Sequence, residues 1–274
     1  MIAEIPVPLD LDAYLKRIEC SGGNSAGNLR PSAETLRQVH LAHATHVPFE
    51  NLDVLLGRPI SLDLQTIERK IVGNHRGGYC FEQNALLAGV LERIGFPVTQ
   101  LSGRVRYYTT RVLPRTHMVL KVEADGQGWL ADVGFGGIAL IEPIALVPDV
   151  EVRQGVWRLR LKREGDWWVL QSFYGGEWVD QYAFDLEPHL PIDYELGNFY
   201  CSSHPDSRFV QTLIVQLASS DRRVMLKNWE FIEIEAGGQR PQKVAGDEHL
   251  LELLRERFGL QFPAGTKFGF KENT

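Results

Sequence analysis

The sequence predicts an α+β fold in which helices come first and antiparallel strands follow. Apolar residues repeat with the helical period of about 3.6 as far as Gly95, and from Val98 onward the period changes to two. A last helical pattern follows Asp247, with Leu250, Leu254 and Phe258 on one face. The chain therefore divides into a helical first third, a strand-rich middle and a mixed end.

Four helices are expected in the first third. Capping residues precede three of them, at Asp10, Ser32 and Asp63. The second is expected to run to about Ala44, and the third to end at Gly73. The fourth carries a stripe that stops at Gly95, made of Leu87, Val90, Leu91 and Ile94. Extending this face backwards passes through Asn84 and reaches Cys80, which places Cys80 in the first turn of the helix, on its interior side.

Strands are expected in the middle and last thirds. HMVLKVEA (117–124) and GWLADVGF (128–135) alternate and are joined by a turn at Asp125-Gly126. VWRLRL and WWVLQSFY continue the pattern, which is typical of an antiparallel sheet or a small barrel. VQTLIVQLA, RRVMLK and WEFIEIEA add further strands before Asp247, which is expected to cap the last helix.

Composition excludes several classes of protein. The 274 residues are 44% hydrophobic, enough for a substantial core, so a disordered or fibrous chain is excluded. The net charge of -6 and a pI near 5.8 give no attraction to nucleic acid or anionic membrane, so neither is expected as a partner. The opening MIAEIPVPLDLDAYL lacks the features of a secretion signal, and a cytoplasmic location is expected. Cys20, Cys80 and Cys201 are widely spaced, which argues against a disulfide framework and against a metal site.

Cys80 lies in the stretch RGGYCFEQN, at the start of the fourth helix. A cysteine just inside a helix is often a small buried hydrophobe. It can also be a nucleophile, because the positive end of the helix dipole lowers the pKa of a thiol. Its position alone fits both interpretations.

A cysteine nucleophile needs a histidine to hold its proton and a carboxylate or amide to orient that histidine. The 117–135 hairpin supplies both, because folding it at the Asp125-Gly126 turn brings Asp132 within one or two positions of the residue facing His117. Both polar residues lie in apolar strands, where each needs a polar partner. This coincidence favours a catalytic triad of Cys80, His117 and Asp132, although a structural histidine and a capping aspartate fit the pattern too.

The chain resembles the arylamine N-acetyltransferases, a family found in bacteria and animals. The resemblance is carried by RGGYCFEQN around Cys80, THMVLKVE around His117, LADVGFGG around Asp132 and VPFENLDVLLGRPISLD at 47–63. It covers most of the chain. It implies an N-terminal helical bundle with the nucleophile (1–95), a β-barrel with the histidine and aspartate (96–205) and a C-terminal α/β lid (206–274), built around a papain-like triad.

The resemblance also implies the reaction. Acetyl passes from acetyl-CoA, the co-substrate, to a small aromatic amine or hydrazine by a ping-pong mechanism through an acetyl-cysteine, with no metal. Further residues take roles by motif match: Phe49 and Phe135 in the acceptor pocket, a buried Glu50–Arg76 pair and Asn84 supporting the site, and a turn that approaches the cofactor through Gly134, Gly136 and Gly137. Arg104, Arg106, Arg111 and Arg115 are interpreted as a solvated barrel face rather than as ligands of CoA phosphates.

Other functions remain open at this point. Relatives with the same triad use other acyl-CoAs or close macrocycles as amide synthases. A transglutaminase-like cysteine hydrolase would use the triad in the same chain order, and a non-catalytic ligand-binding protein could keep the fold. The natural acceptor, the oligomeric state (a homo-oligomer is allowed) and any role for Cys20, Cys201 or the polar 20–31 loop are not determined by the sequence.

Overall fold

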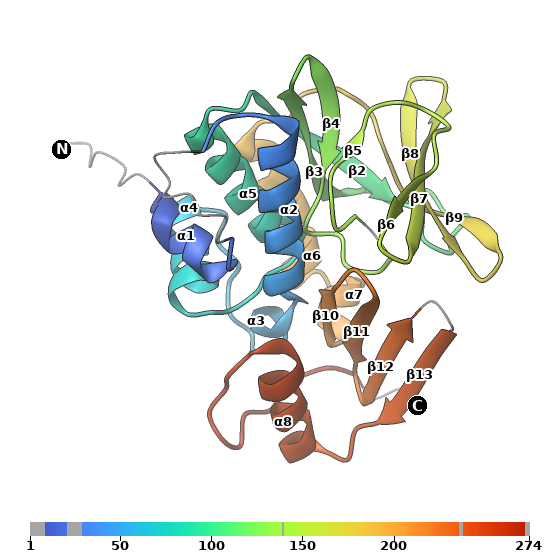
Figure 1. Ribbon diagram of the computed structural model, residues 1–274. Helices are drawn as coiled ribbons and strands as arrows, with labels where there is room; N and C mark the ends of the chain where they lie inside the picture. The colour runs from blue at the N-terminus through green and yellow to red at the C-terminus, as the bar shows by residue number, and fades with distance from the viewer. Residues whose placement is uncertain (1–8, 21–28, 139, 236–237, 272–274) are drawn as a thin grey trace.

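The computed structural model describes residues 9–20, 29–138, 140–235 and 238–271. Most of the polar loop expected at 20–31 lies outside these residues. Among the described residues, the strands form an eight-stranded and a five-stranded antiparallel sheet, with the helices packed around them (Figure 1). The α+β class is confirmed. No helix in the described ranges is long and apolar enough to span a membrane.

The first third is helical, as predicted. The side chains of Asp10, Ser32 and Asp63 each accept a hydrogen bond from a backbone N–H in the first turn that they precede, so the three caps are confirmed. The third predicted helix ends at Gly73 as expected, but its second half is a π-helical turn, and a short helix after the VPFEN stretch was not expected. The helices are α1 (Leu11–Arg17), α2 (Ala33–His46), α3 (Leu52–Leu55), α4 (Leu64–Glu68), the π-helical η2 (Arg69–Gly73) and α5 (Cys80–Ile94).

The middle third forms a nearly closed barrel with the strand order β5-β4-β3-β2-β9-β8-β7-β6. The strand expected at 128–135 is shorter than predicted and ends at Ala131, because the Asp132 N–H leaves the ladder to bond the His40 ring. The strands are β2 (Val98–Val105), β3 (Arg115–Ala124), β4 (Gln127–Ala131), β5 (Ile144–Ala145), β6 (Val152–Gln154), β7 (Trp157–Glu164), β8 (Trp167–Tyr174) and β9 (Glu177–Phe184).

The C-terminal part contains the second sheet, of order β1-β10-β11-β12-β13, with α8 packed on it. Gly246 is the N-cap of α8 and Asp247 is its first residue, so the predicted Asp247 cap is wrong. The predicted VQTLIVQLA strand begins only at Ile214, because α7 occupies its start. The elements are β1 (Phe49–Glu50), α6 (Pro191–Ser203), α7 (Arg208–Gln211), β10 (Ile214–Ala218), β11 (Arg222–Lys227), β12 (Glu230–Glu235), β13 (Gly238–Lys243) and α8 (Asp247–Phe258).

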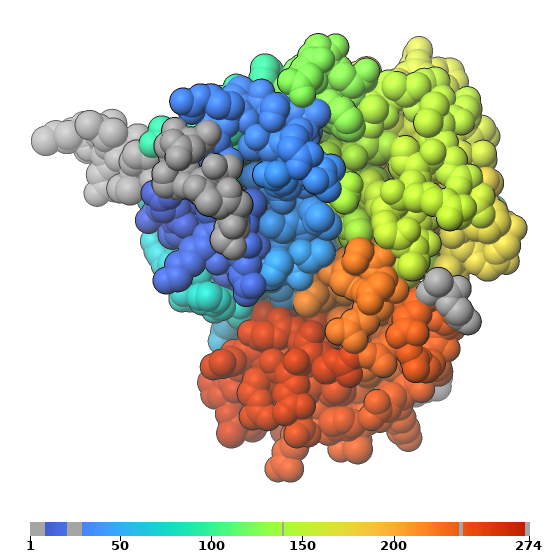
Figure 2. Space-filling view, viewed as in Figure 1, coloured from blue at the N-terminus to red at the C-terminus, as the bar shows by residue number. Residues whose placement is uncertain are grey.

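The three regions meet around α5 and the short strand β1. One core cluster joins the helices to the barrel, and a smaller cluster joins α3 to the C-terminal sheet and α8. β1 comes from the N-terminal third but pairs with β10, and Phe49 also bridges to Gly78 in the loop before Cys80. In Figure 2 the helical and barrel regions lie side by side above the C-terminal region. The loop that carries Cys80 is therefore held where all three regions converge.

Candidate active site

Cys80 is the first residue of α5 and is buried. The helix starts there because the Glu82 side chain folds back to accept the Tyr79 N–H at 3.1 Å. The preceding loop passes so close to β1 that a Cβ at Gly77 would lie 2.0 Å from the Pro48 carbonyl oxygen, so only glycine fits. The Cys80 thiol faces β3 and lies 3.6 Å from the Thr116 carbonyl oxygen.

His117 and Asp132 form a buried pair beside this thiol. His117 Nε2 lies 2.8 Å from Asp132 Oδ2, and both residues are almost fully excluded from solvent. The register pairs Leu120 with Ala131, so Asp132 follows directly after the last paired residue, within the predicted two positions of His117. Because Nε2 is engaged by the carboxylate, Nδ1 is the ring nitrogen available to the thiol. The sequence-predicted residues are therefore brought together.

The Asp132 carboxylate is held on both oxygens. Oδ1 accepts hydrogen bonds from Asn84 Nδ2 at 2.8 Å and from the Gly134 N–H at 2.9 Å. Burial raises the pKa of Asp132, but the charge and hydrogen bond of His117 outweigh it, so the pKa lies below its ordinary value. Asn84 also accepts the Val133 N–H at 3.0 Å, which ties α5 to this turn. The carboxylate therefore stays ionised and fixed in place.

Asp132 changes the basicity of His117. Burial lowers the pKa of the His117 imidazolium, but the adjacent carboxylate is stronger and raises it to about 10. Burial raises the pKa of the Cys80 thiol, while the hydrogen bond and positive charge of His117 act in the opposite direction. A proton that leaves Cys80 is therefore accepted by an imidazole whose basicity Asp132 has raised, and the resulting imidazolium keeps its counter-charge.

Two aromatic rings fix the plane of the imidazole. The ring centroids of Tyr182 and Phe135 lie 4.6 Å and 5.0 Å from that of His117, and the two aromatic rings are 5.0 Å apart. Tyr182 is fully buried, and burial, reinforced by the charge of Asp132, raises the pKa of its phenol well above 10. It therefore stays neutral.

Buried ion pairs hold the loop that precedes Cys80. Arg76 donates to Glu50 Oε1 from Nε and Nη2, at 2.9 and 2.7 Å, and to Asp53 Oδ1 at 3.2 Å. Lys70 bridges Asp53 and Glu82 at 2.9 and 2.7 Å. The predicted Glu50–Arg76 pair thus exists and belongs to a larger network, whose members hold one another in position.

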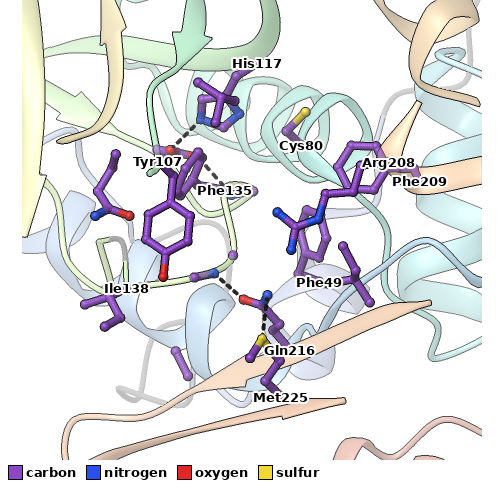
Figure 3. Close-up of a pocket in the computed structure, with 18 of the residues that line it drawn as sticks. Phe49, Cys80, Tyr107, His117, Phe135, Ile138, Arg208, Phe209, Gln216 and Met225 are labelled. Atoms are coloured by element: carbon purple, nitrogen blue, oxygen red, sulfur yellow. Dashed lines mark hydrogen bonds and ion pairs between the residues drawn. The ribbon is translucent and has the colours of Figure 1, made fainter. Parts of the chain in front are cut away.

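A cavity of about 510 Å³ opens beside the thiol (Figure 3). Phe49 and Phe135 both line it, as do Gly134, Gly136 and Gly137. A Cβ at Gly134 would lie 2.7 Å from the Cys80 Cα, so this glycine also lets the turn pack directly on Cys80. Further walls come from the C-terminal region, through Arg208, Phe209, Gln216 and Met225.

Three of the four barrel arginines contact other protein groups. Arg106 pairs with Glu164 at 2.6 Å, Arg115 pairs with Asp185, and Arg104 bonds the Leu113 carbonyl oxygen at 2.7 Å. These contacts fit a solvated barrel face. Within the described ranges, no group of three or more histidine, cysteine or acidic side chains is arranged to hold a metal ion.

Comparison with known proteins identifies the family of the chain. A family model described as N-acetyltransferase matches residues 32–266. Arylamine N-acetyltransferase of Escherichia coli (strain K12) is 42% identical over 253 residues, which cover 91% of this chain and 88% of that protein. The chain belongs to the arylamine N-acetyltransferase family.

Two further members of the arylamine N-acetyltransferase family extend the comparison. The Salmonella typhimurium protein named arylamine N-acetyltransferase / N-hydroxyarylamine O-acetyltransferase is 38% identical over 265 residues, covering 96% of this chain and 92% of that protein. The structure of Mycobacterium marinum arylamine N-acetyltransferase in complex with CoA superposes with a TM-score of 0.85 at 32% identity, covering 91% and 92% of the two chains.

Sequence reasoning missed several residues of the site. His40 accepts the Asp132 N–H at 3.0 Å through Nε2, and Tyr182 of β9 packs its ring against His117. The pattern of α2 contained one signal, since His40 and His43 are spaced to share the buried face with Leu36 and Val39. For Tyr182 and Arg208 no local signal existed, because their positions depend on the packing of distant elements.

Proposed function

We propose that this protein transfers acetyl from acetyl-CoA to aromatic amines or hydrazines by a ping-pong mechanism through an acetyl-Cys80 intermediate. The observation that carries the proposal is the buried Cys80, His117 and Asp132 cluster at the wall of a largely apolar cavity. The names of its relatives support the reaction and the acceptor class, and the name of the Salmonella typhimurium protein adds N-hydroxyarylamines as candidate acceptors.

In the first half-reaction, His117 takes the Cys80 proton and the thiolate attacks the thioester carbon of acetyl-CoA. A new C–S bond forms while the bond to the CoA sulfur breaks, and the His117 imidazolium protonates the departing sulfur. One thioester replaces another, so the step costs little free energy. Asp132 stabilises the imidazolium during the transfer.

In the second half-reaction, the acceptor nitrogen attacks the acetyl carbon on Cys80. His117, now neutral, takes the proton that the amine loses, and the Cys80 thiolate leaves with the electron pair of the C–S bond. The product is an amide, which is more stable than the thioester, so the transfer runs toward acetylated amine.

The remaining predicted residues take supporting roles in this proposal. Phe49 and Phe135 hold the acceptor ring, because flat aromatic walls favour a flat aromatic ligand. The turn formed by Gly134, Gly136 and Gly137 gives the CoA arm close access to backbone groups. The Glu50–Arg76 pair and Asn84 hold the cysteine loop and the aspartate.

Each of the three predicted segments has its own role in this proposal. Residues 1–95 supply the nucleophile, 96–205 supply the histidine and aspartate, and 206–274 close the cavity as a lid. The cytoplasmic location that the sequence predicts stays part of this proposal.

Steady-state kinetics test the proposal. Initial rates with both substrates varied, acetyl-CoA and a simple arylamine, should give parallel double-reciprocal lines, with acetylated amine as product. Cys80→Ala should abolish transfer and leave the circular dichroism spectrum unchanged, while Cys20→Ala, a control outside the cavity, should keep the activity. Intersecting lines, or turnover by Cys80→Ala, would remove the covalent mechanism.

A further inference from the structure

Helix α6 exposes apolar side chains where a surface helix normally carries polar ones. Ile192, Leu196 and Phe199 are four and three residues apart, so they form one stripe on the same face of the helix. They are 62%, 80% and 68% exposed, and Leu190, the N-cap residue, adds a side chain that is 64% exposed. Among the described residues, α6 is the only helix that exposes large hydrophobic side chains in this way.

The opposite face of α6 is packed against the protein, so turning the stripe inward would unpack that face. Tyr194 and Cys201 are buried there, and the Tyr194 hydroxyl donates to the Leu101 carbonyl oxygen at 3.1 Å. A Cβ at Gly197 would lie 2.9 Å from the Phe81 side chain of α5. The helix, which runs behind α2 in Figure 1, is therefore seated by its inner face and presents the stripe outward.

The stripe is large enough to form the centre of an interface between proteins. Taking about 180 Å² for each fully exposed side chain of this size, the four exposed fractions correspond to about 500 Å² of apolar surface. Exposed patches of about 300–600 Å² are the largest on a typical monomer, and they often mark an interaction site. A stable dimer buries about 800 Å² on each partner, which the stripe and its exposed margin of Asp193, Glu195 and Ser203 supply together.

The charges around the stripe disfavour a membrane as the partner. No lysine or arginine occurs in residues 186–207, while Glu187, Asp193 and Glu195 are exposed. Helices that lie on membranes carry basic residues beside their apolar stripe, and an anionic lipid surface would repel this face. The surface therefore suits another protein.

The spacing of the stripe suits a second copy of the same chain. Ile192 lies four residues before Leu196 and Phe199 lies three residues after it, so the stripe is nearly symmetric about Leu196. When two α6 helices pack antiparallel about a twofold axis at Leu196, each Ile192 meets the Phe199 ring of the other copy. A smaller side chain then faces a larger one, an alternation that lets two apolar surfaces interdigitate.

We propose that this protein forms a twofold-symmetric dimer through the outer face of α6, with Leu196 of each copy at the axis. The inner face of the same helix reaches the candidate active site, because the Tyr79 hydroxyl donates to Asn198 Oδ1 directly before Cys80. The dimer therefore holds the helix that supports the start of α5. The two Glu195 carboxylates lie on the same side of the axis, and their repulsion weakens the dimer at low salt.

Sedimentation velocity over a range of protein concentrations tests the proposal. The unmodified protein should pass from monomer to dimer as its concentration rises. The dissociation constant should rise at least about 100-fold in Leu196→Glu, because the dimer would bury two unpaired carboxylates at the axis. Val150→Glu adds the same charge at an exposed position before β6 and should leave the constant unchanged. Higher salt should tighten the dimer, since it screens the two Glu195 carboxylates.

A cysteine substitution tests the symmetry of the dimer. Leu196→Cys places two thiols beside each other at the axis, so mild oxidation with copper phenanthroline should link the copies into a covalent dimer that dithiothreitol separates. Ser203→Cys is the matched control at the far end of α6. Its two thiols would lie about 20 Å apart in the antiparallel pair, so it should give no covalent dimer, which also controls for the native cysteines.

Four results would overturn the proposal. A protein that stays monomeric at every concentration would remove the dimer, and binding of that monomer to phosphatidylcholine vesicles through Leu196 would make α6 a membrane contact. A dimer that Leu196→Glu leaves intact would place the interface elsewhere. A dimer without the Leu196→Cys link would exclude the twofold arrangement, and one that loosens with salt would contradict the placement of Glu195. These measurements need no acetyl transfer, so they are independent of the proposed function.

Discussion

We expect two buried histidines on α2 to make the protein sensitive to acid. His40 Nε2 accepts the Asp132 N–H at 3.0 Å, so it carries no proton, and Nδ1 donates to the Ile141 carbonyl oxygen at 2.9 Å. His43 lies between the Tyr14 hydroxyl at 2.8 Å and Gln83 Oε1 at 3.2 Å. His40 is therefore held neutral by its partners, and protonation would break the hydrogen bond that positions the aspartate.

The pKa values give the size of the effect. Burial lowers the pKa of His40 to about 4 and that of His43 to about 3, from an ordinary value of 6.5. Because the unfolded chain takes up these protons first, the free energy of unfolding falls as the pH drops below 6.5, by about 1.4 kcal/mol per pH unit for each histidine. At pH 5 each histidine lowers the free energy of unfolding by about 2 kcal/mol, and the two together lower it by about 4 kcal/mol.

Urea unfolding at pH 7 and pH 5 measures this loss. His40→Gln keeps a donor and an acceptor but does not titrate, so its loss between the two pH values should be about 2 kcal/mol smaller than in the unmodified protein. His189→Gln, at a half-buried loop position outside the site, should keep the full loss. Identical pH dependence in the unmodified protein and His40→Gln would refute the reasoning.

Three further predictions concern the site. Gly134→Ala should reduce acetylation of Cys80 and lower the free energy of unfolding by about 1–3 kcal/mol, because its Cβ would lie 2.7 Å from the Cys80 Cα; an unchanged urea midpoint and acylation rate would argue against this packing. Acylation followed by stopped flow should slow as the pH rises through about 10, where His117 loses the proton that it gives to the CoA sulfur; a rate still climbing beyond that pH would contradict the assignment. Glu50→Gln should cost about 3 kcal/mol in urea unfolding, because Arg76 loses its charged partner, and a loss below about 1 kcal/mol would show that Asp53 alone suffices.

Local patterns determined much of the fold. The caps at Asp10, Ser32 and Asp63 are visible in the sequence because they act on N–H groups within the next three residues. Helix α6 has a local start signal in Pro191 and Asp193, but it lacks an apolar stripe facing the core, since Ile192 and Leu196 are exposed. The edge strand β13 is exposed throughout and is defined only by pairing with β12.

The candidate site, too, could be predicted only in part from the sequence. Cys80, His117 and Asp132 could be chosen from the sequence because each is an unusual residue for its local pattern. Their register could not be fixed, since it depends on the turn at Asp125, which takes φ 52 and sets Leu120 opposite Ala131. The cavity walls from α7, β10 and β11 result from β1 joining the C-terminal sheet, a long-range pairing that no local pattern encodes.

The acetyl-cysteine intermediate is the central claim, and intact-protein mass spectrometry with acetyl-CoA alone tests it most directly. The protein should gain the mass of one acetyl group, the modified peptide should contain Cys80, and the group should leave as acetylated amine when an arylamine is added. A protein that stays unmodified with acetyl-CoA, yet forms acetylated amine when both substrates are present, would contradict it.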